Sequence, residues 1–194
     1  MISQLLPAIR ATVLVTILLG IIFPIAMTLI CAIAFPHQAE GSLIRNASGE
    51  VIGSELLAQS FNKPEYFHAR PSAAGKGYAG EASGGTNLGP TSQKLIDAVV
   101  ETAVQFRKEN ALADSAKVPI DAATKSGSGL DPDISVQNAR LQANRVALAR
   151  GIPTERVQSL VTERTASRTI GIFGEPRVNV LMLNLAIDEL GNKP

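Results

Sequence analysis

ATVLVTILLGIIFPIAMTLICAIAF, residues 11–35, contains no charged side chain. As an α-helix this segment would be roughly 37 Å long, and the hydrocarbon core of a bilayer is about 30 Å thick. Its polar side chains are three threonines, whose hydroxyls can bond to carbonyls of their own helix. Pro24 is expected to kink the helix, which membrane helices tolerate. The segment therefore predicts an N-terminal membrane anchor.

Two other interpretations of this segment stay open. Ala32-Ile33-Ala34 would suit the cleavage site of a signal peptide, but the apolar stretch exceeds the usual roughly 7–15 residues and almost no basic residue precedes it. A lipoprotein signal is disfavoured because Ile30, rather than a small residue, precedes Cys31. The remaining interpretation is a buried core helix.

The charges around the span predict its orientation. Arg10 precedes the span, whereas the first basic residue after it is Arg45, which follows Glu40. The positive-inside bias then favours a cytoplasmic N-terminus and an extracytoplasmic remainder, by one or two charges. We accordingly expect an anchor over residues 1–36 and one extracytoplasmic domain over residues 37–194.

The composition of this domain excludes several classes of function. All 17 acidic residues of the chain and all its basic residues except Arg10 lie after the span. This balanced charge, with no Trp and 4% aromatic residues, argues against a nucleic-acid partner. The single Cys31 removes intramolecular disulfides.

Local patterns predict an α+β domain with a small sheet. Periodicity and turn residues indicate strands and helices, and the stretch from Ser72 to Pro90, rich in Gly, Ser and Ala, indicates a long loop. The expected elements are a hairpin of 43–45 with 50–52, a strand at 66–69, a helix capped by Thr91, a strand at 118–124, a helix from Ser135 to Arg150 stopped by Gly151, a helix starting near Thr154 and a terminal helix over 178–190.

No motif predicts a catalytic or metal site. Gly75-Lys76-Gly77 lacks the hydroxyl residue and the helix of a phosphate-binding loop, and Ser126-Gly127-Ser128-Gly129 lacks the first glycine of a nucleophile elbow. Asp131 and Asp133 could bind a hard cation, but acidic residues before a helix are more often caps. His68 has no partner His or Cys that would make a zinc site.

Three loops carry a resemblance that these patterns do not explain. They read YFHARPS at 66–72, SGGTNLGP at 83–90 and SGSGLDP at 126–132, and Gln142–Gly151 and Val178–Asp188 complete the set. In this order they resemble the C subunit of Kdp-type potassium-transporting ATPases over almost the whole chain. Thr86 and Asp133 depart from the family pattern, where Ser, and His or Asn, are frequent.

The resemblance implies a non-catalytic subunit of a pump in the bacterial inner membrane. Its partners would be a channel-like potassium-translocating subunit, a P-type ATPase subunit and a small accessory subunit, besides the lipid bilayer. It would stabilise the complex and act as a catalytic chaperone that raises the apparent ATP affinity of the ATP-hydrolysing subunit. No cofactor is expected to bind this chain itself, since the partner subunit uses the ATP.

The resemblance also singles out residues. Gln142 corresponds to a position linked to nucleotide interaction, with a place on the polar face of a helix as the alternative. An extracytoplasmic domain cannot touch cytoplasmic ATP, so we expect coupling through conformational populations instead. The residues expected in partner-contacting or scaffold loops are Arg70, Pro71, Gly84, Gly85, Asn87, Gly89, Ser128, Gly129 and Asp131.

The glycines of these loops, at 84, 85, 127 and 129, are expected to adopt positive φ or to allow close backbone approach. Two other classes of function stay open beside the pump subunit. One is a membrane-anchored hydrolase that uses Ser128 and His68. The other is a membrane-anchored extracytoplasmic solute-binding module that uses the glycine-rich loops.

Overall fold

The computed structural model describes residues 2–191, and its contacts divide the chain into two compact units, Met1–Leu43 and Ile44–Pro194. The predicted division after residue 36 stays a prediction. We call these two units the N-terminal unit and the folded unit.

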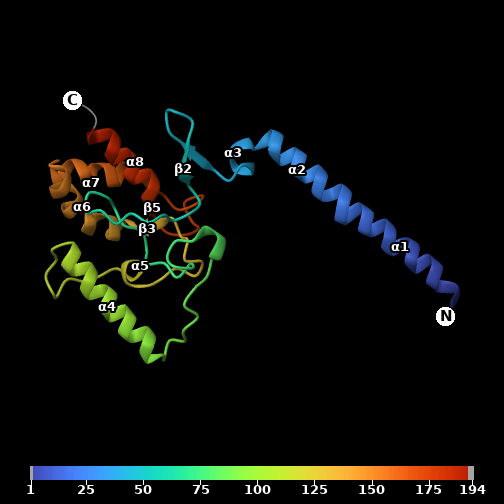
Figure 1. Ribbon diagram of the computed structural model, residues 1–194, viewed down its shortest axis with the longest axis horizontal. Coiled ribbons are helices and arrows are strands. Elements are labelled where there is room, and N and C mark those ends of the chain that lie inside the picture. Colours follow the sequence, from blue (N-terminus) through green and yellow to red (C-terminus); the bar gives the residue numbers. More distant parts are fainter. Residues whose placement is uncertain (1, 192–194) are drawn as a thin grey trace. The chain divides into compact units, whose positions relative to one another are not determined.

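The N-terminal unit is dominated by one long apolar helix (Figure 1). Leu5–Ala34 is long and apolar enough to cross a membrane, with a mean hydropathy of 2.7, and none of its most apolar window is buried. A core helix would be buried, so the helix is compatible with a single-pass membrane protein. Its elements are η1 (Ile2–Gln4), α1 (Leu5–Ile17), the π-helical η2 (Leu18–Ile22), α2 (Phe23–Ala34) and α3 (Pro36–Ala39).

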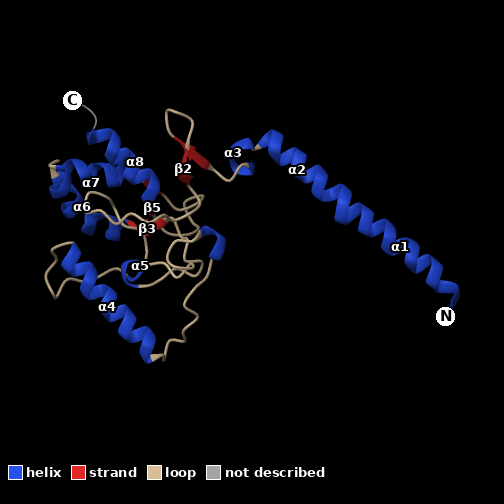
Figure 2. Cartoon of the chain, in the orientation of Figure 1, coloured by secondary structure: helices blue, strands red, loops and turns tan. Residues whose placement is uncertain are grey.

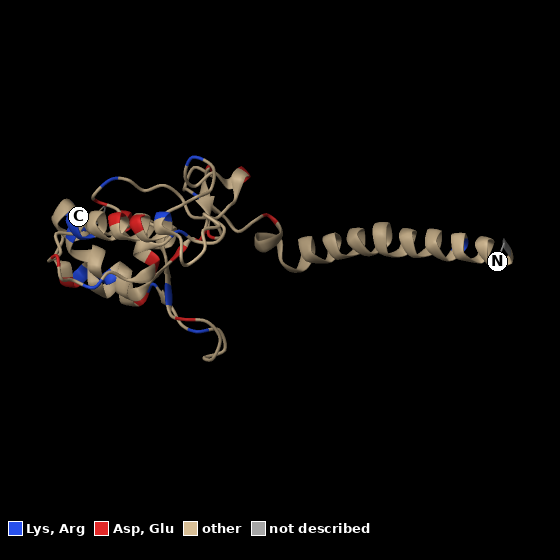
Figure 3. Ribbon diagram, turned by 90° about the horizontal axis from the view of Figure 1, so that it is seen from below, with Lys and Arg blue, Asp and Glu red and all other residues tan. Residues whose placement is uncertain are grey.

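Pro24 lies in the first turn of α2, directly after the π-helical turn of η2. Proline lacks an N–H and collides with the carbonyl four residues earlier, and a wider turn at such a point is a common adjustment. The hydroxyl of Thr28 donates to the Pro24 carbonyl at 2.8 Å, which confirms the expected threonine bond within the helix. Figure 3 shows that charged residues are concentrated in the folded unit and nearly absent from the long helix.

The folded unit combines helices with two small sheets, which confirms the α+β class (Figure 2). β1 pairs with β2 around the predicted turn, and β3, β5 and β4 form an antiparallel sheet in that order. The elements are β1 (Leu43–Arg45), β2 (Val51–Ser54), η3 (Gly80–Ala82), α4 (Gln93–Glu109), α5 (Ile120–Ala123), β3 (Asp133–Ser135), α6 (Val136–Arg150), α7 (Thr154–Glu163), β4 (Thr165–Ala166), β5 (Arg177–Asn179) and α8 (Val180–Gly191).

Helix α6 follows its sequence signals at both ends. The Ser135 hydroxyl accepts a hydrogen bond from the Asn138 N–H at 3.1 Å, and Gly151 ends the helix with φ +65°. An L-residue with a Cβ is disfavoured in that left-handed conformation, so glycine is the usual terminator. α7 buries Val157, Leu160 and Val161, as predicted.

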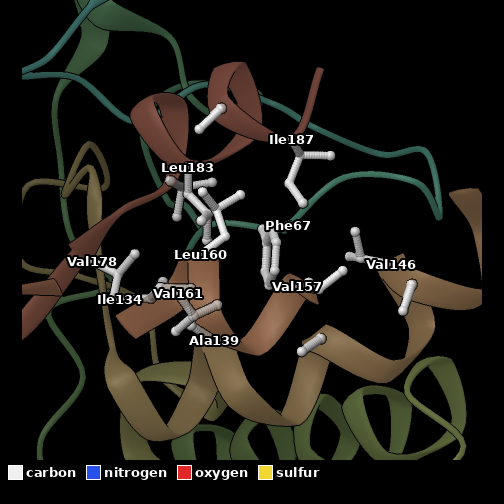
Figure 4. Packing of buried hydrophobic residues seen from close by; sticks show 14 residues of the cluster. Phe67, Ile134, Ala139, Val146, Val157, Leu160, Val161, Val178, Leu183 and Ile187 are labelled. Carbon is white, nitrogen blue, oxygen red and sulfur yellow. The ribbon is translucent and has the colours of Figure 1, made fainter. Parts of the chain in front are cut away.

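The core is formed by α6, α7 and α8 with the three-stranded sheet and one loop residue, Phe67 (Figure 4). The Phe67 side chain is fully buried between Leu183 and Ile187 of α8 on one side and Val146 and Val157 on the other. Burying a phenylalanine contributes about 1.5–3 kcal/mol. The loop that carries it is therefore part of the core.

Four predicted elements are wrong in type or extent. Residues 66–69 form no strand, because their backbone bonds to side chains. Residues 120–123 form the helix α5, whose Asp121 carboxylate accepts from the backbone and hydroxyl of Ser135. The cap residue of α4 is Ser92 rather than Thr91. Val178 and Asn179 belong to β5, and α8 begins only at Val180.

A fragment that begins at His37 should be water-soluble and fold cooperatively, because every residue of the main core cluster lies in the folded unit. Circular dichroism and urea unfolding of residues 37–194 check this. An aggregated or unfolded fragment would contradict it.

Mass spectrometry of the mature protein from membranes should detect residues 1–34, and their absence would identify Ala34 as a cleavage point.

Candidate functional site

The first loop, residues 66–72, is fixed by two side-chain amides from different helices. The Phe67 N–H donates to Asn184 Oδ1 at 2.8 Å, and Asn184 Nδ2 donates back to the Phe67 carbonyl at 2.9 Å. The His68 N–H donates to Gln142 Oε1 at 2.7 Å, and Gln142 Nε2 donates to the His68 carbonyl at 3.1 Å. We call this arrangement the amide clamp. The two amides bond to the N–H and carbonyl groups of residues 67 and 68, as the backbone of a neighbouring strand would.

Gln142 has no hydrogen-bonding capacity left for a ligand. Its side chain, 1% exposed, also donates from Nε2 to Asn138 Oδ1 at 2.8 Å and accepts at Oε1 from Arg145 Nη2 at 2.8 Å. A glutamine amide has two donors and one carbonyl with two lone pairs, and all are used here. Gln142 therefore lies in the interior and not on a polar outer face of α6.

Arg145 secures the start of the first loop. Its Nη1 donates to the carbonyls of Pro64 at 2.6 Å and Tyr66 at 2.9 Å, and its Nε donates to Asn110 Oδ1 at 3.0 Å. The guanidinium fork suits several carbonyls at once. Arg145 therefore connects α6, the residue after α4 and the chain entering the loop.

The His68 ring contacts a backbone carbonyl and a carboxylate. Nε2 lies 3.2 Å from the Lys63 carbonyl and Nδ1 lies 3.7 Å from the Glu109 carboxylate. Burial, reinforced by the charge of Arg145, lowers the pKa of His68. The Ser128 hydroxyl instead accepts from the Leu130 N–H at 3.1 Å. The contacts of these two residues do not form the pair that the hydrolase alternative requires.

The three resembling loops meet at one place, which we call the three-loop junction. Arg70 of the first loop pairs with Asp131 of the third at 2.8 Å, and the Ser72 hydroxyl donates to the Gly129 carbonyl at 2.7 Å. The Gly84 N–H of the second loop, 83–90, donates to the carbonyl of Ser128 at 2.8 Å. Figure 2 shows loops crowded beside α5 and β3. The structure thus brings together most of the residues that the sequence singled out.

Two of the four junction glycines are required by the packing. At Gly129, with φ +70°, an added Cβ would lie 2.6 Å from the Ala74 nitrogen and 2.8 Å from the Gly84 oxygen. At Gly85 it would lie 2.8 Å from the Gly127 oxygen. Gly84 and Gly127 have neither positive φ nor an atom within 4 Å of such a Cβ, so the expectation was wrong for these two.

The remaining loop residues stand at the edges of the junction. Asn87 adopts φ +51°, a conformation that asparagine tolerates better than most residues. The Gly89 carbonyl accepts from the Ser92 N–H at the start of α4. Pro71 is half-buried within the first loop.

Asp131 and Asp133 are engaged by arginines rather than arranged for a cation. Asp131 pairs with Arg70, and Asp133 pairs with Arg177 at 2.9 Å. Burial raises the pKa of Asp133, against the opposing effect of Arg177. Within residues 2–191 no group of three or more His, Cys, Asp or Glu side chains could hold a metal ion.

A groove between α4 and α5 adjoins the second loop but is small. Its volume is about 110 Å³, and it is lined in part by Thr86, Leu88, Lys94 and Lys125. Ligand pockets usually measure roughly 300–1,000 Å³. The groove gives little support to a solute-binding module.

Comparison with known proteins decides the family. The family model "KdpC: K+-transporting ATPase, c chain" matches residues 5–189. The chain belongs to this family. The KdpC subunit of the potassium-transporting ATPase of Caulobacter vibrioides is 52% identical over 188 residues, which cover 97% of this chain and 94% of that protein. Those of Mycobacterium tuberculosis and Myxococcus xanthus are 50% and 48% identical, covering 96% and 97% of this chain and 98% and 89% of theirs.

Sequence reasoning missed Asn184, Asn138 and Arg145 as partners in the KdpC-type core. A signal existed for Asn184, since it stands among apolar residues of a helix that is otherwise suited to burial. A polar side chain at such a position needs a hydrogen-bond partner. The partner itself, the backbone of residues 67–68, lies far away in the sequence and could not be identified from it.

Gly129→Val should destabilise the folded unit by roughly 2–4 kcal/mol, because left-handed strain and overpacking against two backbone atoms add together. Gly85→Val should cost about 1–3 kcal/mol from overpacking alone. Urea unfolding of residues 37–194 measures both. The matched controls are Gly84→Ala and Gly127→Ala, which have open space. Equal losses in all four variants would refute the close-packed junction.

Gln142→Ala should cost roughly 2–4 kcal/mol, since each buried polar group left without a partner costs about 1–3 kcal/mol. Native-state hydrogen exchange should show faster exchange of the His68 amide, which loses its acceptor. Gln158→Ala, at an exposed position of α7, is the control and should change stability little. A Gln142→Ala variant as stable as this control would show that the amide clamp contributes nothing.

Proposed function

We propose that this chain is a non-catalytic subunit of an ATP-driven potassium uptake pump, which it stabilises and whose apparent ATP affinity it raises. Membership of the KdpC family supports the pump, and the names of the relatives assign each of them to a potassium-transporting ATPase. The partners would be the channel-like, P-type ATPase and small accessory subunits. Arg70, Ser72 and Asp131 of the three-loop junction bond to groups within the junction, which supports a scaffold rather than a catalyst.

The proposed location is the bacterial inner membrane, with one span, a cytoplasmic N-terminus and an extracytoplasmic folded unit. The apolar helix supports the span. The single Arg10 before it and the later Arg45 support the orientation, through the positive-inside bias. In that orientation the folded unit and cytoplasmic ATP are on opposite sides of the membrane.

The buried, fully bonded state of Gln142 is the observation that carries the mechanism. Nucleotide contact through this side chain would require its bonds to His68, Asn138 and Arg145 to break. Leaving those partners unsatisfied inside the protein would cost several times the roughly 1 kcal/mol of a typical net hydrogen bond. Gln142 is therefore proposed as a structural residue, and ATP as a ligand of the partner subunit only.

The coupling is proposed to be a shift in conformational populations. A rigid domain that binds one state of a partner more tightly than another favours that state and every ligand that prefers it. The amide clamp and the three-loop junction supply the rigidity, because their contacts join three loops and two helices, α6 and α8. No nucleotide needs to approach the folded unit in this scheme.

The orientation can be tested by thiol labelling in a Cys31→Ser background. A cysteine at Ser115, exposed in the loop after α4, should react with a membrane-impermeant reagent in intact cells. A cysteine at Ser3, before the span, is the matched control and should react only after lysis. The opposite pattern would place the folded unit in the cytoplasm and make direct contact with ATP credible.

Calorimetry should detect no stoichiometric ATP binding to residues 37–194, and binding in the low-micromolar range would overturn the indirect mechanism. In the assembled pump, Gln142→Ala should shift apparent ATP affinity by less than about 150-fold, the upper range of allosteric couplings.

Ser128→Ala should leave potassium-stimulated ATPase activity within a few-fold. A loss of several orders of magnitude in Ser128→Ala, with the complex intact, would restore a catalytic interpretation.

A further inference from the structure

The carbonyl of Leu19 lacks a hydrogen-bond donor from its own helix. In an α-helix the donor would be the N–H of Phe23, but at the π-helical turn of η2 this N–H donates to the Leu18 carbonyl instead. In a π-helix the donor would be residue 24, which is a proline and has no N–H. Pro24 therefore leaves the Leu19 carbonyl without its α-helical or its π-helical donor.

This carbonyl lies where an unpaired polar group is most costly. Leu19 is close to the midpoint of the apolar helix Leu5–Ala34. No water reaches the middle of a bilayer, so backbone groups at that depth have to be paired within protein. A threonine hydroxyl can pair a carbonyl three or four residues before it, but positions 22 and 23 are Ile and Phe. The span therefore has no side chain of its own that satisfies the Leu19 carbonyl.

Glycine at position 20 leaves the helix surface open next to this carbonyl. Gly20 is exposed, and a Cβ there would lie 3.8 Å from Cγ2 of Thr16, which is an ordinary contact. The helix itself therefore does not require glycine, which is less favourable than alanine at such a position. Thr12 and Thr16 extend the same face at four-residue spacing. Membrane helices approach one another closely at faces of small residues.

The missing donor has to come from a helix of different sequence. Lipid acyl chains carry no hydrogen-bond donor. A second copy of this chain would cross the membrane in the same direction, so two copies would pair in parallel and bring equal levels of their spans together. At the level of Leu19 the span reads ILLGIIF, residues 17–23, and none of these side chains carries a donor. Neither lipid nor a second copy can therefore satisfy the carbonyl.

We infer that the face formed by Thr12, Thr16 and Gly20 packs against a transmembrane helix of another subunit, which donates a hydrogen bond to the Leu19 carbonyl. The partner helix has small residues at the contact and a Ser, Thr, Asn or Gln side chain at the level of Leu19, because these side chains bond between membrane helices. The inference rests on the proposed function, which supplies the neighbouring subunits. The span is then a recognition element as well as an anchor.

Replacing Pro24 tests the missing donor. Pro24→Ala in the full-length chain allows a regular α-helix, in which the Phe23 N–H returns to the Leu19 carbonyl and the partner's donor loses its acceptor. The dissociation constant from the other pump subunits, measured in detergent micelles, should rise roughly 3- to 20-fold, as for one lost interhelical hydrogen bond. Pro7→Ala, in the first turn of α1 where N–H groups have no α-helical partner, is the matched control. An unchanged constant in Pro24→Ala would overturn the inference.

Photo-crosslinking in intact cells identifies what occupies the face. Benzoylphenylalanine in place of Thr16 should crosslink to a transmembrane peptide of another subunit, which mass spectrometry identifies. Leu14 lies about 200° around α1 from Thr16, so the same group in place of Leu14 is the control and should give several-fold less of this product.

A crosslink from position 14 alone, or from neither position, would overturn the inference. A crosslink from position 16 to a second copy of this chain would overturn it as well. If the wild-type chain does not co-purify with subunits of a potassium pump, the proposed function fails. The inference still stands in that case if position 16 crosslinks to a transmembrane peptide of another protein and Pro24→Ala weakens that association, and it fails if either result is missing.

Discussion

The amide clamp is the constraint on which the rest of the folded unit depends. A chain segment that carries Phe67 into the core also takes its own N–H and carbonyl groups out of water, and each needs a partner. Among residues 2–191 no strand pairs with residues 67–68, so Asn184 and Gln142 provide two donors and two acceptors. Because these amides come from α8 and α6, the clamp also fixes the two helices on opposite sides of the loop.

The three-loop junction follows from this placement. Once residues 67–68 are held, Arg70 and Ser72 lie where they can bond to Asp131 and the Gly129 carbonyl of the third loop. The second loop is held to the third by the hydrogen bond from the Gly84 N–H to the Ser128 carbonyl. Since Gly129 packs against the backbone at Ala74 and Gly84, a side chain there would separate all three loops.

This hierarchy gives the glycine-rich loops a role that needs no bound phosphate. Glycine is used where backbone approaches backbone, and hydroxyl groups are used to satisfy nearby amides and carbonyls. Loops joined in this way form a stiff part of the folded unit. A stiff surface can favour one conformation of a partner by differential binding, which a flexible one does poorly because ordering it costs conformational entropy.

The sequence by itself determined the features that depend on near neighbours or on composition. The apolar span, the hairpin around Asn46–Gly49, the Ser135 cap and the Gly151 stop of α6 are all local, because each depends on a few adjacent residues. The family also followed from the order of short motifs. The orientation and the partner contacts stay predictions.

Only the tertiary structure decided which polar groups meet. Residues 66–69 have the composition of a strand, yet their bonding partners are side chains 74 and 117 residues away. Residues 118–124 likewise have the composition of a strand, but residues 120–123 form α5. The Asp121 carboxylate of α5 accepts hydrogen bonds from Ser135 and Asn138. Local propensity is worth tenths of a kcal/mol per residue, whereas an unsatisfied buried polar group costs about 1–3 kcal/mol. The long-range requirement to satisfy buried groups therefore overrode the local pattern, and it could be seen only once the chain was folded.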